Sequence, residues 1–501
     1  MTVFIVFCNK SYETPTNPMP MKQLFKTAIL LLTVTMILPA TLSAKPKKAK
    51  KQGYHISLHV DGAKDDTVYM GYYSMKGGIY AIDTAVNDGK GNYVYDGDTL
   101  LYQGLYLFTN TKGKYVEFCV HKESQEFAFS TKNDDWAQHI KVKGSPENEV
   151  FYAFQAEQRA LKDDVQAASK RLSEDEFETY RAAQLKKNDS LMLNYIETNP
   201  ELMFTKMMKS TIPIEVPLVD EKGDSLSNQE RYEHYASHYF DNIPIDEEFL
   251  LRTPENVGFN KKLEDYFNVT LKNTMPDFII PHVDAMIDKA RPAPEMFKYL
   301  VHTTAERYLQ SNVMVYDEVY VHMIHRYYAS GEAFWASPSS IDENVHRADI
   351  WEKILVGKTA PELILKDTLG TYHSLGIECK RHQYTLLMFW SPSCGHCKVT
   401  IPEMHEIYEK YKTEYDIAAF AILSEPDDHT RPLWKKFIKQ HDLNWLNLDG
   451  GECNVDWKEV YDVTTTPKIV LLDREKKIIA KKFSPETFEG LIKNQLKKVG
   501  E

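Results

Sequence analysis

Short runs of alternating hydrophobic and polar residues dominate the chain between residues 53 and 144. His55–Val60 and Tyr115–Val120 show this pattern, which is typical of strands with one buried face. The turn-forming sequence Asp88–Gly91 lies between such runs. We therefore predict a small β-sandwich over residues 53–144.

The spacing of apolar residues becomes helical after Ser145. Serine suits the N-cap of a helix, and Pro146 suits its first position. Long stretches with helical spacing then continue, interrupted by proline and glycine. These stretches predict an all-α domain over residues 145–345, with a linker at Ser337–Asp342 near its end.

The last segment alternates between strand and helix. Tyr384–Trp390 and Ile417–Leu423 are continuous apolar runs, as expected of strands buried on both faces. Lys468–Asp473 and Lys477–Ala480 predict a hairpin near the end of the chain. The chain is therefore predicted to be multi-domain, with an α/β domain over residues 350–501 preceded by the small β-sandwich and the all-α domain.

The first 52 residues read as targeting sequence rather than as a domain. Residues 21–44 contain a basic start, an apolar run and small residues before a cleavage point, in the order of a secretory signal peptide. Residues 1–20 read as an over-extended translation start, and the lysine-rich residues 45–52 as a basic linker. We expect export to the periplasm or cell envelope, with a retained membrane tether as the alternative.

Composition limits the function classes. A chain of 501 residues exceeds what one hydrophobic core usually serves, which agrees with several domains. The net charge of −12 is spread along the chain and argues against a general nucleic-acid binder. Six cysteines are too few for a disulfide framework in a chain of this size, and the one closely spaced pair is Cys394 and Cys397.

This pair stands where a buried strand passes into a helix. Unpaired N–H groups at a helix N-terminus stabilise the thiolate of the first cysteine, Cys394, which makes it the attacking group. Positive charge on His396 would stabilise the reduced form further and raise the reduction potential. Half of a zinc site is the alternative explanation, but zinc needs four ligands and the chain has no second pair. We therefore predict no metal at this site.

The motifs around the pair resemble a known family. In order, they are Val356–Pro361, Gly370 with Ser374–Leu375, the run Phe389-Trp390-Ser-Pro-Ser-Cys394-Gly395-His396-Cys397, Ile401–Pro402, and Thr466–Pro467. Together they cover about 140 residues and resemble the thioredoxin superfamily, most closely the TlpA/ResA-like thiol-disulfide oxidoreductases of bacterial envelopes.

The resemblance implies a thioredoxin fold, with Cys394 as nucleophile, Cys397 as resolving thiol and a cis bond before Pro467. We expect Trp390, Gly395, His396, Thr466 and Pro467 to support the active site, with Trp390 shielding it. No cofactor is implied. The expected partners are protein thiols and disulfides, together with a membrane electron donor.

Two positions depart from the family pattern. Thioredoxins usually bury an acid six residues before the first cysteine, where this chain has Met388. Envelope relatives often carry a glutamate three residues after the second cysteine, where this chain has Thr400. Such an acid helps to move the proton of the resolving thiol, so water, the Thr400 hydroxyl or His405 is expected to assist instead.

The predicted function is an exported thiol-disulfide oxidoreductase that acts on protein thiols, as a reductase or an isomerase. One alternative is a binding protein whose N-terminal domains bind a partner while the thioredoxin domain acts as a redox-regulated module. A peroxidase of the AhpC/TSA type is a second alternative, although a Cys-x-x-Cys pair occupies the place of its peroxidatic cysteine.

Other chemistry-bearing residues have ordinary explanations. Cys379 and Cys453 either pair or remain free, and Cys119 reads as a strand-core cysteine. Glu318, His322 and His325 have a spacing that could bind a metal, but a solvated or hydrogen-bonded helix face is the expected arrangement.

Overall fold

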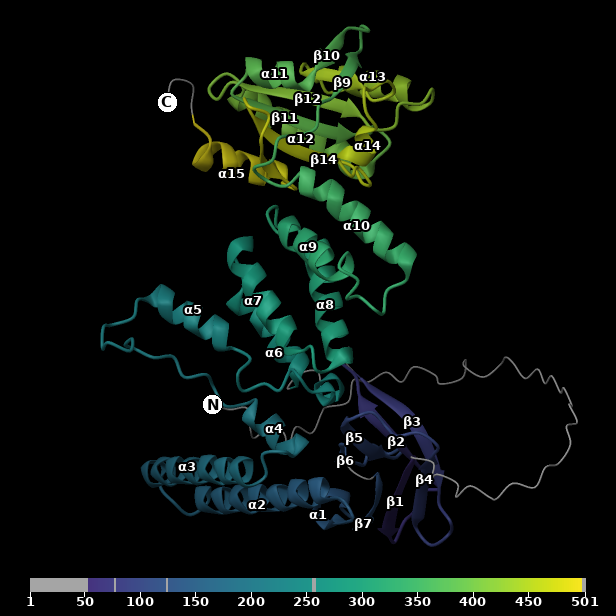
Figure 1. The fold of residues 1–501 in the computed structure, drawn as a ribbon, viewed down its shortest axis with the longest axis vertical. Coiled ribbons are helices and arrows are strands. Elements are labelled where there is room, and N and C mark those ends of the chain that lie inside the picture. Colours follow the sequence, from purple (N-terminus) through teal and green to yellow (C-terminus); the bar gives the residue numbers. More distant parts are fainter. Residues whose placement is uncertain (1–52, 76–77, 123–124, 255–257, 498–501) are drawn as a thin grey trace, which may run out of the picture. The chain divides into compact units, whose positions relative to one another are not determined.

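The computed structural model describes residues 53–75, 78–122, 125–254 and 258–497, and its ribbon is drawn in Figure 1. The chain divides into two compact units, Met1–Val269 and Thr270–Glu501. Their boundary falls inside the predicted helical domain 145–345, because the helices after residue 270 pack with the C-terminal α/β part. The predicted segments 1–20, 21–44 and 45–52 lie outside the described residues.

The first unit begins with the expected β-sandwich, built from two four-stranded sheets with the orders β4-β1-β7-β8 and β3-β2-β5-β6. Inward-facing side chains of both sheets form one core, in which the Phe108 and Phe118 rings stack at 4.4 Å and Phe129 packs edge-on against Phe108. The strands are β1 (Tyr54–Asp61), β2 (Thr67–Tyr73), β3 (Ile79–Val86), β4 (Asn92–Gly97), β5 (Gly104–Thr109), β6 (Tyr115–Val120), β7 (Glu126–Lys132) and β8 (Lys141–Lys143), with the short helix α1 (Trp136–His139) before β8.

Helices complete this unit. As predicted, Ser145 caps α2, its Oγ accepting the N–H of Asn148, and Pro146 opens the helix. The helical elements are α2 (Pro146–Ser169), α3 (Glu174–Thr198), α4 (Met203–Lys209), α5 (Asn228–His238), η2 (Glu248–Arg252), α6 (Phe259–Asp265) and η3 (Tyr266–Thr270), the last of which crosses into the second unit.

The second unit opens with α7 (Pro276–Lys289), α8 (Pro294–Leu309), α9 (Asp317–Met323), η4 (Ile324–Tyr328) and α10 (Pro338–Lys353). The predicted linker Ser337–Asp342 is wrong, because these residues begin α10. The Ser337 side chain accepts the N–H of Ser340 and Pro338 occupies the first helical position, the same start signal that was recognised at Ser145.

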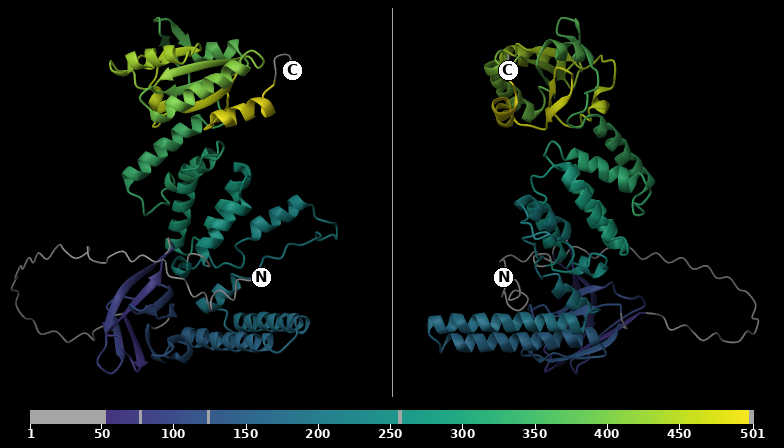
Figure 2. Two further views of the ribbon diagram at one scale, coloured as in Figure 1. Left: turned by 180° about the vertical axis from the view of Figure 1, so that it is seen from behind. Right: turned by 60° about the vertical axis from the view of Figure 1, so that its left-hand side comes forward.

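The rest of the second unit is an α/β domain (Figure 2). Its seven-stranded sheet has the order β10-β9-β13-β12-β11-β14-β15. Central strand β11 pairs in parallel with β12 and antiparallel with β14, and β14 and β15 form the predicted hairpin. The strands are β9 (Ile364–Asp367), β10 (Tyr372–Ser374), β11 (Tyr384–Trp390), β12 (Ile417–Leu423), β13 (Leu446–Asp449), β14 (Lys468–Asp473) and β15 (Ile478–Lys481).

Helices cover both faces of this sheet. Side chains of α12 (Gly395–Tyr411), α13 (Thr430–Gln440) and α15 (Pro485–Gln495) share one core with Leu386, Met388 and Trp390 of β11. On the other face lie α11 (Leu375–Arg381) and α14 (Trp457–Val460), where the Phe389 and Trp457 rings stack at 5.3 Å. This is the predicted thioredoxin arrangement.

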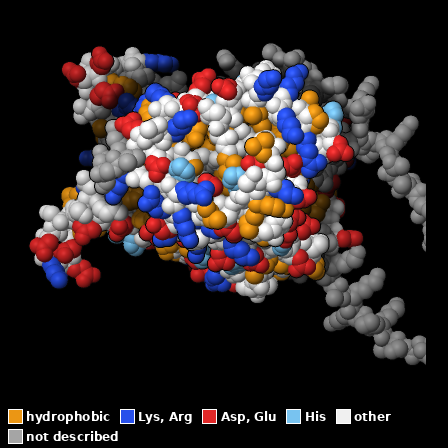
Figure 3. All heavy atoms as spheres, turned by 90° about the horizontal axis from the view of Figure 1, so that it is seen from above, with side chains coloured by type: hydrophobic (Ala, Val, Ile, Leu, Met, Phe, Trp, Pro, Cys, Tyr) orange, Lys and Arg blue, Asp and Glu red, His pale blue; other side chains and the backbone are white. Residues whose placement is uncertain are grey.

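No helix in the described part of the chain combines the length and apolarity needed to cross a membrane. Acidic, basic and apolar side chains are interspersed over the face drawn in Figure 3.

Candidate active site

The dithiol lies at the end of β11, where the chain turns into α12. The N–H of Cys394 donates to the carbonyl oxygen of Ser391 (3.2 Å), which closes the turn that follows the strand. Cys394 occupies the N-cap position of α12, and Lys398 N donates to its carbonyl oxygen at 3.2 Å. The sequence predicted this strand-to-helix placement from the apolar run before the pair.

Cys394 is the half-buried thiol of the pair. It donates a hydrogen bond to the carbonyl oxygen of Thr466, with 3.2 Å between Sγ and O. The Thr466–Pro467 peptide bond is cis, as predicted. Burial opposes ionisation of Cys394. Hydrogen bonds from the backbone N–H groups of Cys397 and His396, and from the side chains of Thr466 and Cys397, outweigh it. The pKa of the Cys394 thiol therefore lies below its ordinary value.

Cys397 is fully buried beneath it. Burial raises the pKa of the Cys397 thiol to about 12, and the nearby Cys394 sulfur contributes to the rise. A hydrogen bond from the backbone N–H of Ser391 lowers this pKa and so opposes the rise in part. The two sulfurs thus differ: ionisation is favoured at the accessible Cys394 and disfavoured at the buried Cys397.

The other predicted support residues occupy different environments. Trp390 is fully buried and packs against Phe437 at 5.3 Å, in the same core as Cys397, so its shielding of the site stays a prediction. Gly395 and His396 are exposed. His396 acts on Cys394 through its backbone N–H. A Cβ at Gly395 would meet no atom within 4 Å, so packing does not require glycine there.

Met388, which replaces the usual buried acid, and the two candidates for moving the proton, Thr400 and His405, lie in different surroundings. Met388 is buried in the apolar core. Thr400 is half-buried on the second turn of α12. His405 is a wrong candidate, because eight residues of helix place it about 12 Å along α12 from Cys397. Its Nε2 instead pairs with Asn444 Oδ1 at 3.2 Å.

Sequence reasoning missed a polar pair beside Cys397. Ser391 is 1% exposed, and its Oγ donates to Glu425 Oε2 at 2.5 Å. The one sequence feature that could have indicated this pair is the serine three residues before Cys394. Its partner, Glu425, lies 34 residues further along the chain. The parallel register of β11 and β12, which aligns Trp390 with Leu423, brings the residues after the two strand ends together.

The remaining described cysteines are free thiols, so the structure has Cys379 and Cys453 unpaired. Cys379 is buried, and burial raises the pKa of its thiol. Cys453 is half-buried and lines a shallow surface cavity of about 470 Å³ beside Asn454 and Trp457. Cys119 is a strand-core residue whose pKa is raised well above its ordinary value by burial.

The predicted helix face near Val319 is hydrogen-bonded. His322 Nε2 lies 2.9 Å from Asp284 Oδ2, and His325 Nε2 lies 3.0 Å from Asp349 Oδ1. The two histidines thus have different carboxylate partners on different helices. Across the residues that the structure describes, no group of three or more His, Cys, Asp or Glu side chains is placed to hold a metal ion.

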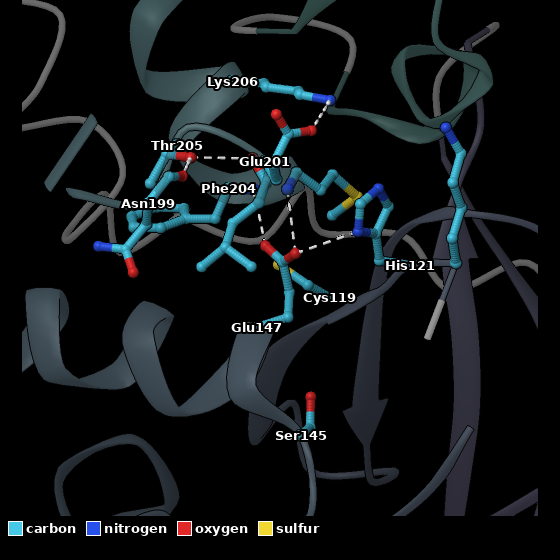
Figure 4. Close-up of polar contacts among 12 residues, drawn as sticks. Cys119, His121, Ser145, Glu147, Asn199, Glu201, Phe204, Thr205 and Lys206 are labelled. Atoms are coloured by element: carbon cyan, nitrogen blue, oxygen red, sulfur yellow. Dashed lines mark hydrogen bonds and ion pairs between the residues drawn. The ribbon is translucent and has the colours of Figure 1, made fainter. Parts of the chain in front are cut away.

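A second polar cluster lies in the first unit, around the buried carboxylate of Glu147 (Figure 4). Its oxygens accept the N–H groups of Met203 at 3.0 Å and Phe204 at 2.7 Å, and His121 Nδ1 lies 3.4 Å away. The neighbouring Cys119 is buried, and burial raises the pKa of its thiol, which disfavours a reactive thiolate in this cluster. It is a structural centre that joins the sandwich to α2 and α4.

Three features define the thioredoxin class of dithiol domains: a central sheet with helices on both faces, a Cys-x-x-Cys pair at a helix N-terminus, and a cis X-Pro peptide whose carbonyl oxygen contacts the first thiol. Comparison with known proteins agrees. A family described as "Thioredoxin-like" matches residues 382–478. Two domains of unknown function, DUF4369 and DUF5106, match residues 54–151 and 186–344.

Among curated proteins, the thiol-disulfide oxidoreductase ResA of Bacillus thuringiensis subsp. konkukian is 31% identical over 150 residues, which cover 30% of this chain and 80% of that protein. ResA of Bacillus cereus is 29% identical over 141 residues, covering 28% and 76%. A solved thioredoxin-like protein from Bacteroides caccae aligns with a TM-score of 0.47 at 20% identity, covering 57% of this chain and 99% of the other. The chain belongs to the ResA-like thiol-disulfide oxidoreductases of the thioredoxin superfamily.

Proposed function

We propose that this protein exchanges dithiol for disulfide with client proteins in the cell envelope, with Cys394 as the attacking thiol and Cys397 as the resolving thiol. The observation that carries the proposal is the difference between the two sulfurs: a half-buried thiol of lowered pKa at a helix N-terminus above a buried thiol with a pKa of about 12.

The reaction follows from this arrangement. The Cys394 thiolate attacks one sulfur of a client disulfide, and the other client sulfur leaves and takes up a proton. The Cys397 sulfur then attacks Cys394 in the mixed disulfide, which forms the Cys394–Cys397 bond and releases the second client sulfur. The proton lost by Cys397 ends on that sulfur. The reverse sequence oxidises a client dithiol, and the reduction potential of the pair relative to its partners decides the direction.

Insulin reduction by the full chain tests the exchange. We expect reduction by wild type and none by Cys394→Ser, because that variant lacks the attacking thiol. Cys453→Ser is the matched control, because Cys453 is a partly exposed free thiol of the same domain. It should keep wild-type activity. No insulin reduction by wild type would contradict the proposal and favour the binding-protein alternative.

Trapping identifies the clients and the direction. In Cys397→Ser the mixed disulfide on Cys394 cannot be resolved, so clients should accumulate as covalent complexes in cells. Cytochrome maturation factors would indicate a reductase fed by a membrane donor, whereas many unrelated secreted proteins would indicate an isomerase. A trapping yield no higher than that of the Cys394→Ser/Cys397→Ser double variant would contradict client exchange.

The envelope location rests on the signal-peptide pattern of residues 21–44. We expect the mature protein to begin at Lys45, as measured by N-terminal sequencing of protein from the envelope fraction. A protein recovered from the cytoplasm with residues 21–44 intact would contradict export.

A further inference from the structure

The structure leaves a chemical question at Cys397. This thiol must lose its proton when it resolves a mixed disulfide, yet its burial raises its pKa to about 12. The acid that thioredoxins usually bury in the preceding strand is absent, since Met388 occupies that position in the apolar core. Some other group must therefore support the negative charge that forms on the Cys397 sulfur.

Ser391 has the contacts for this task. Its backbone N–H is hydrogen-bonded to the Cys397 sulfur and favours the thiolate. The same residue is held from three further directions: its carbonyl oxygen accepts Cys394 N–H at 3.2 Å, its Oγ accepts Ser393 N–H at 3.1 Å, and its hydroxyl donates to Glu425 Oε2 at 2.5 Å. Ser391 is 1% exposed, so its own side of each contact is shielded from solvent.

Glu425 is the one charged partner among these contacts. It lies two residues beyond β12, in the loop before α13, and is itself exposed. A hydrogen bond to a carboxylate is stronger than one between neutral groups, so Glu425 anchors the Ser391 side chain more firmly than a water molecule would. A second hydrogen bond, from the Ser424 N–H to the Trp390 carbonyl oxygen at 2.9 Å, joins the ends of β12 and β11 next to this contact.

We propose that Glu425 is a positioning residue for the resolving thiol: through its hydrogen bond with Ser391 Oγ it holds the Ser391 N–H against the Cys397 sulfur during resolution. The step forms the Cys394–Cys397 bond and breaks the bond between Cys394 and the client. The proton of Cys397 ends on the released client sulfur, so no further reactant is needed. This inference deepens the proposed function and rests on it.

The test separates the two steps with 5,5′-dithiobis(2-nitrobenzoate). Attack by Cys394 releases a first thionitrobenzoate, and resolution by Cys397 releases a second, so stopped-flow absorbance gives both rates on the full chain. In Glu425→Ala we expect the second phase to slow about five- to tenfold, the value of one positioned hydrogen bond, with the first phase within about twofold of wild type. Ser391→Ala should show the same split.

Glu425→Gln provides the decisive comparison, because its amide oxygen can accept the same hydrogen bond without the charge. We expect the second phase of Glu425→Gln to be nearly as fast as in wild type. If Glu425 acted through its charge alone, Glu425→Gln would be as slow as Glu425→Ala. Asp428→Ala, which removes an exposed acid from the same loop, is the matched control and should leave both phases unchanged.

Three results would overturn the proposal: a second phase in Glu425→Ala within about twofold of wild type, equal slowing of both phases, or a Glu425→Gln variant as slow as Glu425→Ala. If Ser391→Ala fails to fold, Glu425→Ala still decides the matter, because its side chain is exposed. Absence of both phases in wild type would instead contradict the proposed exchange function itself.

Discussion

At the scale of single residues, hydrogen bonds and burial set the two thiols apart. Backbone N–H groups at the start of α12 lower the pKa of Cys394, whereas burial raises that of Cys397. The side chain of His396 was expected to add positive charge, but the contact that the structure shows from this residue is its backbone N–H. Its effect on the reduction potential stays a prediction.

The pKa difference predicts the order of alkylation. Because a thiolate reacts and a thiol does not, iodoacetamide should modify Cys394 at a pH below the ordinary cysteine value, while Cys397 stays unmodified until the pH approaches 12. Mass spectrometry of the reduced protein, quenched over a series of pH values, measures both. In Cys394→Ser, Cys397 should remain unmodified at neutral pH. Its rapid alkylation there would contradict the assignment of the buried thiol.

At the scale of the elements, a helix in the first unit is capped from a distance. The N-cap residue of α4, Leu202, has no side chain that can accept a hydrogen bond. Glu147 at the start of α2 accepts the first two N–H groups of α4 instead, and its carboxylate is 1% exposed. The capping residue lies 56 residues before Met203, so no local pattern could reveal it.

This contact predicts a large stability effect at Glu147. Glu147→Ala leaves the N–H groups of Met203 and Phe204 without their acceptor and removes the carboxylate beside His121, so we expect the free energy of unfolding to fall by about 2–4 kcal/mol. Urea unfolding measures the change, and hydrogen exchange at Met203 and Phe204 locates it. Glu149→Ala, at an exposed acid in the same helical turn, should cost less than about 0.5 kcal/mol. Equal effects of the two substitutions would contradict the role of Glu147.

At the scale of the whole molecule, the second compact unit joins helices to the thioredoxin domain through a buried charge cluster. Asp317 of α9 is 2% exposed, and its carboxylate lies 2.5 Å from Lys481 Nζ and 2.5 Å from Lys482 Nζ at the end of β15. Lys481 also donates to the carbonyl oxygen of Ile354 at 2.9 Å. Burial lowers the pKa of Lys481, and Asp317 opposes that effect.

Removing the shared carboxylate should therefore destabilise the second unit. In Asp317→Ala the ammonium group of Lys481 is left buried without its counter-charge, so we expect a loss of about 3–5 kcal/mol and faster hydrogen exchange in β14 and β15. Glu318→Ala changes the exposed neighbour on the same helix and should have little effect. Unchanged exchange in β15 of Asp317→Ala would show that the cluster does not hold the helices to the sheet.

Features that depend on local spacing can be predicted from the order of residues along the chain. Apolar periodicity located the strands and the helices, Ser145 and Pro146 marked a helix start, and Cys394 with Cys397 indicated the reaction class. The same start signal occurs at Ser337, where the pattern also predicts a linker, because serine and proline favour turns as well. Tertiary structure alone decided the contacts between distant segments: Glu425 with Ser391, Glu147 with α4, and Asp317 with β15. Strand register and helix packing bring these groups together from distant parts of the chain, so no pattern along the chain could reveal them. At Glu147 and Asp317 burial then strengthens the contact.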